Sequence, residues 1–238
     1  MVIIDNEYPF LVDAGEAYRI DEIVSSTDVG ISLDKKLVVA GNVNICGALH
    51  AATDVAIQGN MVVKGDVGCE GNIAAKRIVC GSTVNIEGTL YSQMDIRMGP
   101  AKIKGTITAE KAIQSLGVLQ LEGGIAAKNT IELRGESTIN GLLVAGVGLI
   151  PRNSLKGDFK YKVMGRTISS HIVITGVVTT MVFYRFEDNS IAVLLVGKQG
   201  LVKSFMGSDN FFKEMQEANY KFKDEYVKIA KAVIGHLV

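Results

Sequence analysis

Residues that could do chemistry are few in this chain. Histidine is the commonest general base near neutral pH, and the chain has three histidines, His50, His171 and His236. Only His50 falls in the repetitive part of the sequence, where it stands between the apolar residues Leu49 and Ala51. Neighbours in a strand point to opposite faces, so His50 is expected to point outward. A single outward histidine is far more often a solvated surface residue than a catalytic base.

Cysteines and glycine loops offer no clearer chemistry. Cys46, Cys69 and Cys80 form no CxxC pair, disulfide framework or zinc signature. The repeat predicts that Cys46 and Cys80 point outward and Cys69 inward, with no His or Lys placed to activate a thiol. The stretch 146–148 (GVG) lacks the helix and basic residue of a phosphate loop. The sequence therefore predicts no catalytic residue, no metal site and no cofactor.

Composition excludes several classes of function. Lys+Arg and Asp+Glu are both 25, so the net charge is zero and no basic footprint for nucleic acid exists. An apolar fraction of 47% with 21% charged residues excludes a disordered chain, and 26 glycines without any Trp favour tightly turning β structure. The N-terminal sequence does not resemble a signal peptide, and no apolar run reaches ~18 residues. We therefore expect no integral membrane segment and a cytoplasmic location.

The elements that would position any site come from an internal repeat of 17 to 18 residues. A first column of aliphatic residues recurs at intervals of 18, 18, 17, 17, 18 and 18, and its members are Leu37, Val55, Ile73, Leu90, Ile107, Ile125 and Leu143. Second and third columns follow six and twelve residues later, beginning at Val43 and Leu49, and each column has a partner two residues on. Residues i and i+2 of a strand share a face, so three such pairs describe one coil of a triangular parallel β-helix.

The content of the columns supports this register. Only Gly81, Ser92, Ser115 and Ser137 are not apolar, and no column position is charged although 21% of the chain is. We expect Ile73, Leu90, Ile107 and Ile125 to form the central core stack. Both 17-residue coils are predicted to lose a residue at one corner, between Val79 and Val84 and between Ile96 and Ala101, where the second has Gly99-Pro100.

A second corner carries a glycine in almost every coil, which predicts a bend through positive φ. These glycines are Gly71, Gly88, Gly105, Gly123 and Gly141. The outward residues beside them include Glu87, Lys104 and Glu122, whose alternating signs predict weak ion pairs between coils.

The domain limits follow from where this register ends. The β-helix is predicted over residues 31–151 with six to seven coils, Ile31 and Leu33 completing the third face of an early coil and Leu149 opening a second face before Pro151. Each end coil would present unpaired backbone groups and apolar side chains, a template for another copy. The predicted self-association residues are Ile31, Leu33, Leu37, Val39, Leu143, Ala145 and Leu149.

The flanks lack the repeat. Residues 1–30 are expected to cap the first coil, and a frayed tail is the alternative. Residues 158–238 predict a small α+β domain with strands at 158–164, 172–186, 191–196 and 201–205 and turns at 187–190 and 197–200. A helix is predicted from Ser208-Asp209, with an apolar stripe that packs on its own sheet or, in a second interpretation, on the solenoid or a partner. The stripe comprises Phe211, Met215, Ala218, Phe222, Tyr226, Ile229, Val233 and Leu237.

Over residues 31–150 the chain resembles the bactofilins. The resemblance rests on the coil length, the coil number and glycine–polar–aliphatic corners such as Gly41-Asn42-Val43, Gly59-Asn60-Met61, Gly71-Asn72-Ile73, Gly88-Thr89-Leu90 and Gly105-Thr106-Ile107. It implies a right-handed coil and a cytoskeletal scaffold that joins end to end into filaments without nucleotide. A folded C-terminal domain departs from the family, because bactofilins carry short, mostly unstructured tails.

Two other functions remain open on the sequence. The chain could be a non-polymerising adaptor in which both ends are capped and the C-terminal domain binds a protein client. It could also be a hexapeptide-type acyltransferase, a left-handed triangular β-helix that needs a general-base histidine, for which His50 is the sole solenoid candidate. The spacing of the glycines differs from the hexapeptide motif, so the scaffold is the favoured interpretation.

Overall fold

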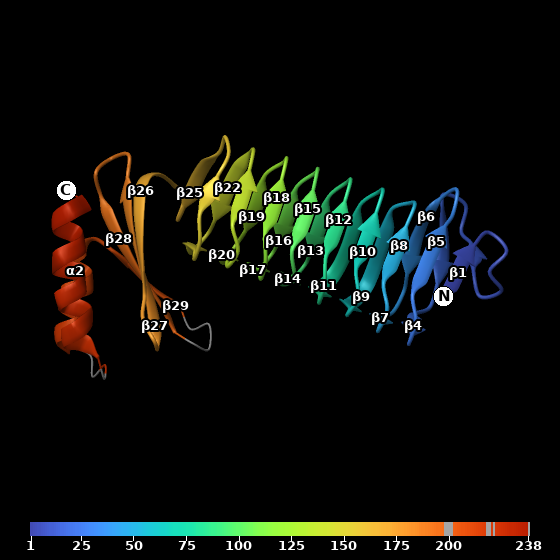
Figure 1. Cartoon of the computed structure of the whole chain (residues 1–238), viewed down its shortest axis with the longest axis horizontal. Helices are drawn as coiled ribbons and strands as arrows, with labels where there is room; N and C mark the ends of the chain where they lie inside the picture. Colours follow the sequence, from blue (N-terminus) through green and yellow to red (C-terminus); the bar gives the residue numbers. More distant parts are fainter. Residues whose placement is uncertain (198–201, 218–219, 221, 238) are drawn as a thin grey trace.

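Most of the protein is a parallel β-solenoid of about eight coils (Figure 1). The computed structural model describes residues 1–197, 202–217, 220 and 222–237. Three parallel sheets form the faces of the solenoid, and a smaller α+β domain with two helices follows it along the same axis (Figure 1). The predicted class of fold is confirmed. The solenoid is longer than the six to seven coils expected, because both flanks contribute strands.

Each coil adds one strand to each face. The first face contains β3 (Ala17–Ile20), β6 (Lys36–Val39), β9 (Val55–Val63), β11 (Ile73–Cys80), β13 (Leu90–Ser92), β16 (Ile107–Ala109), β19 (Ile125–Ala127), β22 (Leu142–Ala145) and β25 (Lys160–Val163). The second face contains β4 (Ile23–Ser25), β7 (Val43–Ile45), the far halves of β9 and β11, β14 (Ile96–Met98), β17 (Ile113–Ser115), β20 (Thr130–Leu133) and β23 (Gly148–Pro151). The third face contains β1 (Val2–Asp5), β5 (Val29–Ser32), β8 (Leu49–Ala51), β10 (Val67–Cys69), β12 (Val84–Ile86), β15 (Ala101–Ile103), β18 (Leu119–Leu121), β21 (Ser137–Ile139) and β24 (Leu155–Lys156).

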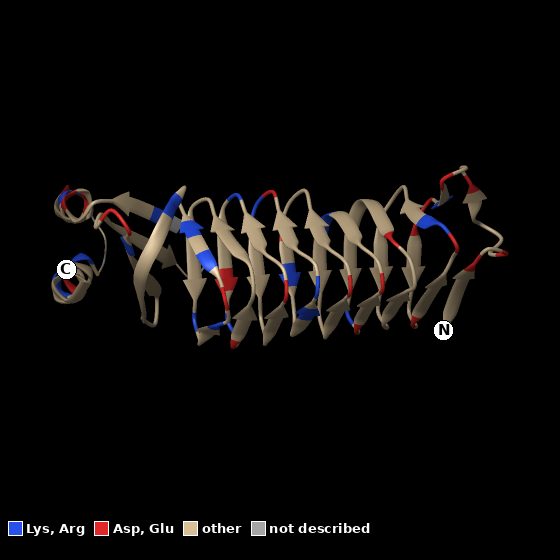
Figure 2. Ribbon diagram, turned by 90° about the horizontal axis from the view of Figure 1, so that it is seen from above, with Lys and Arg blue, Asp and Glu red and all other residues tan. Residues whose placement is uncertain are grey.

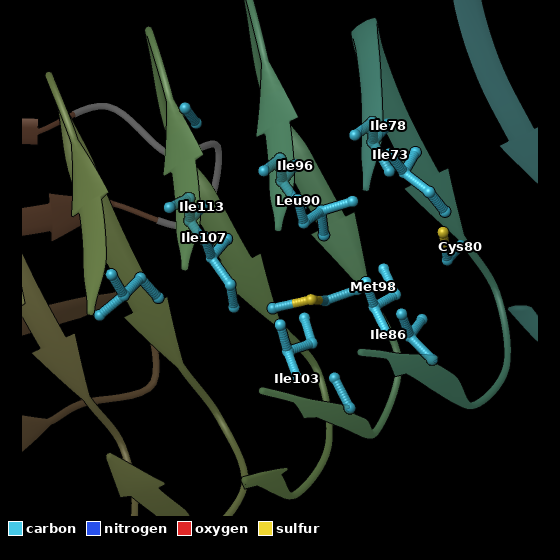
Figure 3. Close-up of a cluster of buried hydrophobic side chains, with 14 of the residues drawn as sticks. Ile73, Ile78, Cys80, Ile86, Leu90, Ile96, Met98, Ile103, Ile107 and Ile113 are labelled. Carbon is cyan, nitrogen blue, oxygen red and sulfur yellow. The ribbon is translucent and has the colours of Figure 1, made fainter. Parts of the chain in front are cut away.

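The columns of the sequence are stacks of buried side chains. Ile73, Leu90, Ile107 and Ile125 are register partners from coil to coil and are at most 1% exposed. Figure 3 shows Ile73, Leu90 and Ile107 following one another along the first face, with the second-face isoleucines beside them. Adjacent layers lie ~4.8 Å apart, so each side chain contacts the ones above and below it. The non-apolar slots Ser92, Ser115 and Ser137 are buried too, and each hydroxyl donates to a nearby backbone carbonyl.

One stretch of the predicted register is wrong. Ile78 and Cys80, not Val79 and Gly81, point inward on the second face, with Ile78 paired to Met61 and Ile96. The 73–90 coil loses its residue at the corner between Ala75 and Ile78, one corner earlier than predicted, and a one-residue slip moves every following side chain to the other face. Cys80, expected to point outward, is therefore buried, and burial raises the pKa of its thiol to about 12.

The second short coil is as predicted. Met98 and Ala101 are both inward, and the corner between them is Gly99-Pro100. The carbonyl of Pro100 accepts a hydrogen bond from the N–H of Val84 at 2.9 Å, so the ladder between coils continues through the turn although proline has no N–H to give.

The corner glycines serve close stacking rather than positive φ. None of the predicted five has a positive φ. A Cβ atom on Gly88, Gly105 or Gly123 would instead lie 2.5, 2.3 and 2.3 Å from the carbonyl oxygen of the corner glycine one coil earlier. Such distances do not occur between real atoms, so the corners of successive coils touch backbone to backbone. Of the predicted ion pairs, Lys104 contacts Glu87; both side chains are about half exposed, so the pair adds little stability.

The N-terminal 30 residues are not a cap. β3 and β4 are in register with β6 and β7, and β1 pairs with β5, so these residues form an additional coil. The third-face pair of this coil is Val29 and Ile31, shifted by two residues from the predicted Ile31 and Leu33. A hairpin strand, β2 (Val12–Asp13), pairs antiparallel with β3 and covers its outer edge.

The C-terminal domain begins later than predicted. The predicted strand at 158–164 is β25, which pairs parallel with β22 and belongs to the solenoid. The predicted strand at 172–186 is two strands, β26 (Arg166–Thr175) and β27 (Thr179–Phe186), separated by a tight turn in which the Gly176 N–H donates to the Thr179 carbonyl. Antiparallel β28 (Ile191–Gly197) and β29 (Val202–Met206) complete the sheet. The turn at 187–190 is confirmed, with Asn189 at φ 64°, whereas most of the predicted 197–200 turn and Leu201 lie outside the described residues.

Two helices cover the outer face of this sheet. The predicted single helix is α1 (Ser208–Glu217) followed by α2 (Lys223–Leu237). As expected, the stripe packs on its own sheet: Phe211, Met215, Val233 and Leu237 share a buried cluster with Phe183. Phe222, Tyr226 and Ile229 lie at the margin of the domain core, and Ala218 lies outside the described residues.

Candidate interaction sites at the two ends of the solenoid

The C-terminal end of the solenoid is covered by the protein's own sheet. The inner face of the sheet, which includes Val182, Tyr184 and Leu194, belongs to the same buried cluster as the solenoid core. The Tyr184 hydroxyl donates to the Leu149 carbonyl at 2.6 Å and accepts from the Leu149 N–H at 2.9 Å. Burial raises the pKa of Tyr184 far above its usual range, so the hydroxyl keeps the proton that it donates. One side chain thus satisfies both backbone groups of an end-coil residue.

This seat is closely fitted. A Cβ atom on Gly148 would lie 2.4 Å from Cδ2 of Leu194, so glycine is needed for the sheet to approach β23. Leu143, Ala145 and Leu149, predicted to mediate self-association at this end, are 0% exposed. They therefore cannot contact a second copy while the C-terminal domain is seated.

Removing the hydroxyl of Tyr184 tests the seat. In Tyr184→Phe the N–H and carbonyl of Leu149 lose their partner in a dry environment, which costs about 1–3 kcal/mol. We expect the urea midpoint to fall accordingly. Tyr91→Phe is the control, since Tyr91 is a partly exposed tyrosine on β13. Equal midpoints for the two variants would contradict the role given to Tyr184.

The residues predicted to form the N-terminal end are internal. Ile31, Leu33, Leu37 and Val39 are all buried, because the coil formed by residues 17–32 lies outside them. The interval from Tyr18 to Leu37 is 19 residues rather than 17 or 18, and the register partners Ile23 and Val43 are 20 apart. The extra residues sit in the corner after β5, and this longer corner hid the coil from the periodicity.

The true N-terminal end is formed by β1, β4 and the 6–16 loop. β4 pairs with β7 on one side, and no strand in the described part of the chain pairs with its other edge. Beside this edge lies a cavity of about 260 Å³ lined by Ile4, Ile20 and Ile23 among others. Five of the eleven exposed large apolar side chains in the described residues gather in this region: Met1, Ile3, Phe10, Val12 and Val24. This end is therefore both apolar and open for strand pairing.

The same end is acidic. Residues 1–30 contain seven acidic residues (Asp5, Glu7, Asp13, Glu16, Asp21, Glu22 and Asp28) and one basic residue, Arg19. Figure 2 shows acidic positions along the loops near the N-terminus. One of these charges is compensated locally, since Lys35 donates to Asp13 and thereby lowers the pKa of that carboxyl.

The residues first considered for chemistry lie far apart in the fold. His50 is exposed on β8, His171 shares a 2.7 Å hydrogen bond with the Tyr161 hydroxyl, and His236 is in the last turn of α2. Burial lowers the pKa of His171, so the neutral ring is favoured. Cys46 is exposed and Cys69 is buried, as predicted.

Comparison with other proteins leaves the fold as the defining property. No protein-family model, curated protein or solved structure matches the chain. Across the described residues, no helix combines the length and apolarity that a bilayer crossing needs, and no group of three or more His, Cys, Asp or Glu side chains is placed to hold a metal ion. The protein is a parallel β-solenoid protein whose C-terminal α+β domain is seated on its last coil.

Proposed function

We propose that the protein is a non-enzymatic, bactofilin-like scaffold that associates through its N-terminal end alone and forms pairs rather than filaments. The observation that carries the proposal is the seat of the C-terminal domain, in which Tyr184 and Leu194 occupy the place that a next coil or a next molecule would take. Filament growth needs two usable ends. With one end closed, association must stop when two N-terminal ends have met.

A second copy is the partner that best fits the N-terminal end. The open edge of β4 is the kind of edge that every internal coil pairs with another coil of this chain. A two-fold axis through this face would bring two copies of β4 together as antiparallel neighbours, an isologous contact that closes on itself. The exposed Val24 and the apolar cavity beside it would then be covered.

This arrangement favours the adaptor interpretation over the end-to-end polymer. Two rods joined at their N-terminal ends would carry a C-terminal domain at each outer end, about eight coils from the junction on either side. Each domain would be free to bind a protein client. We also propose that the coil is right-handed, as the resemblance to bactofilins implies.

A charge on the open edge tests the proposal. Val24→Lys would place an ammonium in the dry centre of the contact, and we expect the dissociation constant of the pair to rise at least tenfold, about 1.4 kcal/mol. Val118→Lys is the control, because Val118 is also an exposed valine but lies in the middle of the solenoid. Sedimentation equilibrium should be run at raised salt, which screens the acidic ends from each other. A wild-type protein that stays monomeric, or a Val24→Lys protein that pairs as well as Val118→Lys, would overturn the proposal.

A further inference from the structure

The largest cavity of the described chain lies at the junction of the two domains and belongs to neither end. Its volume is about 590 Å³, within the range of small-molecule sites. One wall is the outer surface of the second face, contributed by three successive strands through Arg97 of β14, Gln114 of β17 and Glu132 of β20. The opposite wall is the turn between β26 and β27 with the end of β28.

The lining of the cavity is strongly cationic. It contains three arginines, Arg97, Arg134 and Arg152, and a single carboxylate, that of Glu132. With no other charged side chain in the lining, the cavity carries a net charge of +2, from three positive charges and one negative. The whole chain is neutral, so this surplus is a local property of the junction.

Glu132 organises two of the arginines. Its carboxylate, with a side chain 14% exposed, accepts hydrogen bonds from Gln114 Nε2 at 2.7 Å, from Arg134 Nε at 3.0 Å and from Arg152 Nε. Burial opposes ionisation of Glu132, but these hydrogen bonds outweigh it and hold the pKa of the carboxyl below its usual value. Arg152 is further fixed by a 2.7 Å bond from Nη1 to the Thr180 hydroxyl of the C-terminal domain.

The held guanidinium groups retain donors. Among the described residues, Nη2 of Arg152 and Nη1 of Arg134 have no protein acceptor, and Arg97 forms no ion pair. Arginines whose planes are fixed in advance bind oxyanions through paired N–H groups with little loss of entropy. Beside them stand the apolar tips Val177, 86% exposed, and Val178, 44% exposed.

We infer that this junction is a binding site for a small ligand that carries a dianionic oxyanion, such as a phosphate ester, next to an apolar group. The charge of the ligand would balance the surplus of +2, and the apolar group would cover Val177 and Val178. The inference is independent of the self-association proposed above, because the site uses no residue of the N-terminal end.

Calorimetric titration of the full chain with three probes tests the site. Phenyl phosphate should bind more tightly than inorganic phosphate, which lacks the apolar group, and more tightly than benzoate, which lacks the second charge. Arg97→Ala should weaken phenyl phosphate binding about tenfold, since a charge-assisted hydrogen bond is lost. The matched control is Lys102→Ala, which removes an exposed positive charge from the adjacent strand β15, outside the cavity lining.

Each outcome decides the inference. Binding that Arg97→Ala weakens and Lys102→Ala leaves unchanged supports it, whatever the oligomeric state. Absence of saturable binding up to millimolar phenyl phosphate overturns it. Equal weakening by both substitutions also overturns it, because that result would mean binding to surface charge in general. Equal affinity for benzoate and phenyl phosphate would overturn the preference for a dianion.

Discussion

Ile107→Asp should cost the folded protein at least about 4 kcal/mol at neutral pH. Ile107 is 0% exposed and lies between Leu90 and Ile125 in the core stack, where no polar group is its register partner. A carboxylate placed there is either ionised without a partner or protonated at a cost, and both states destabilise the fold. The measurement is the free energy of unfolding in urea.

The pH dependence of this variant has a definite sign. Burial raises the pKa of the new carboxyl in the folded state above its unfolded value of about 3.9. The variant should therefore lose stability relative to wild type as the pH rises above about 4, and should recover part of it in acid. Thr108→Asp, one residue along and facing outward, is the control and should change stability by less than about 1 kcal/mol. If Ile107→Asp does not fold at all, Ile107→Val should still show a loss of about 0.5–1.5 kcal/mol. Equal losses at 107 and 108 would contradict the inward stacking.

Gly105→Ala should destabilise the solenoid by about 1–3 kcal/mol, although it adds a single methyl group at the surface. The added Cβ would meet the Gly88 carbonyl oxygen at 2.3 Å and the Gly88 carbonyl carbon at 2.6 Å. Both are backbone atoms held by the ladder between coils, so the conflict is relieved only by separating two coils. Thermal unfolding followed by circular dichroism would measure the loss.

The control for this prediction is Gly30→Ala. Gly30 lies in β5 of the same solenoid, and a Cβ atom there would have no neighbour within 4 Å. Because alanine restricts the unfolded chain more than glycine does, Gly30→Ala should be neutral or slightly stabilising. If Gly105→Ala were as harmless as Gly30→Ala, the close contact between corners would be disproved.

The periodicity of the sequence was sufficient to predict most of the core. Column members such as Leu37, Leu90 and Ile125 are buried register partners because alternation in a strand and stacking between coils leave a charged residue no place inside. The small residues in partner positions, such as Ala109 and Ala127, are equally buried.

Corners were where the sequence misled. The 73–90 coil could lose its residue at either of two corners, and both choices give aliphatic columns, one with Val79 and one with Ile78. Choosing the second would have avoided a glycine at an inward slot, since it places Cys80 there instead of Gly81. The polar corner residues had a role that periodicity could not reveal. The Oδ1 atoms of Asn42 and Asn72 accept hydrogen bonds from the N–H groups of Asn60 and Thr89 in the next coil.

The candidate sites depended on tertiary contacts that leave weak traces in the sequence. Closure of the C-terminal end rests on Tyr184 reaching Leu149 across 35 residues, and no spacing rule links these two positions. The alternation of strand β27 offered a partial signal, because its residues are apolar on both faces, as a sheet covered on two sides requires. The arginine cavity joins residues from four separate elements, so only the fold could assemble it.

Negative-stain electron microscopy of concentrated full-length protein tests the central claim most directly. If the C-terminal domain closes one end of the solenoid, the images should contain single rods and rods two protomers long, with the broader C-terminal domains at the outer ends of each pair. Raising the concentration should change the proportion of the two forms and not the maximum length. Filaments many protomers long, formed while the C-terminal domain is intact, would contradict the account.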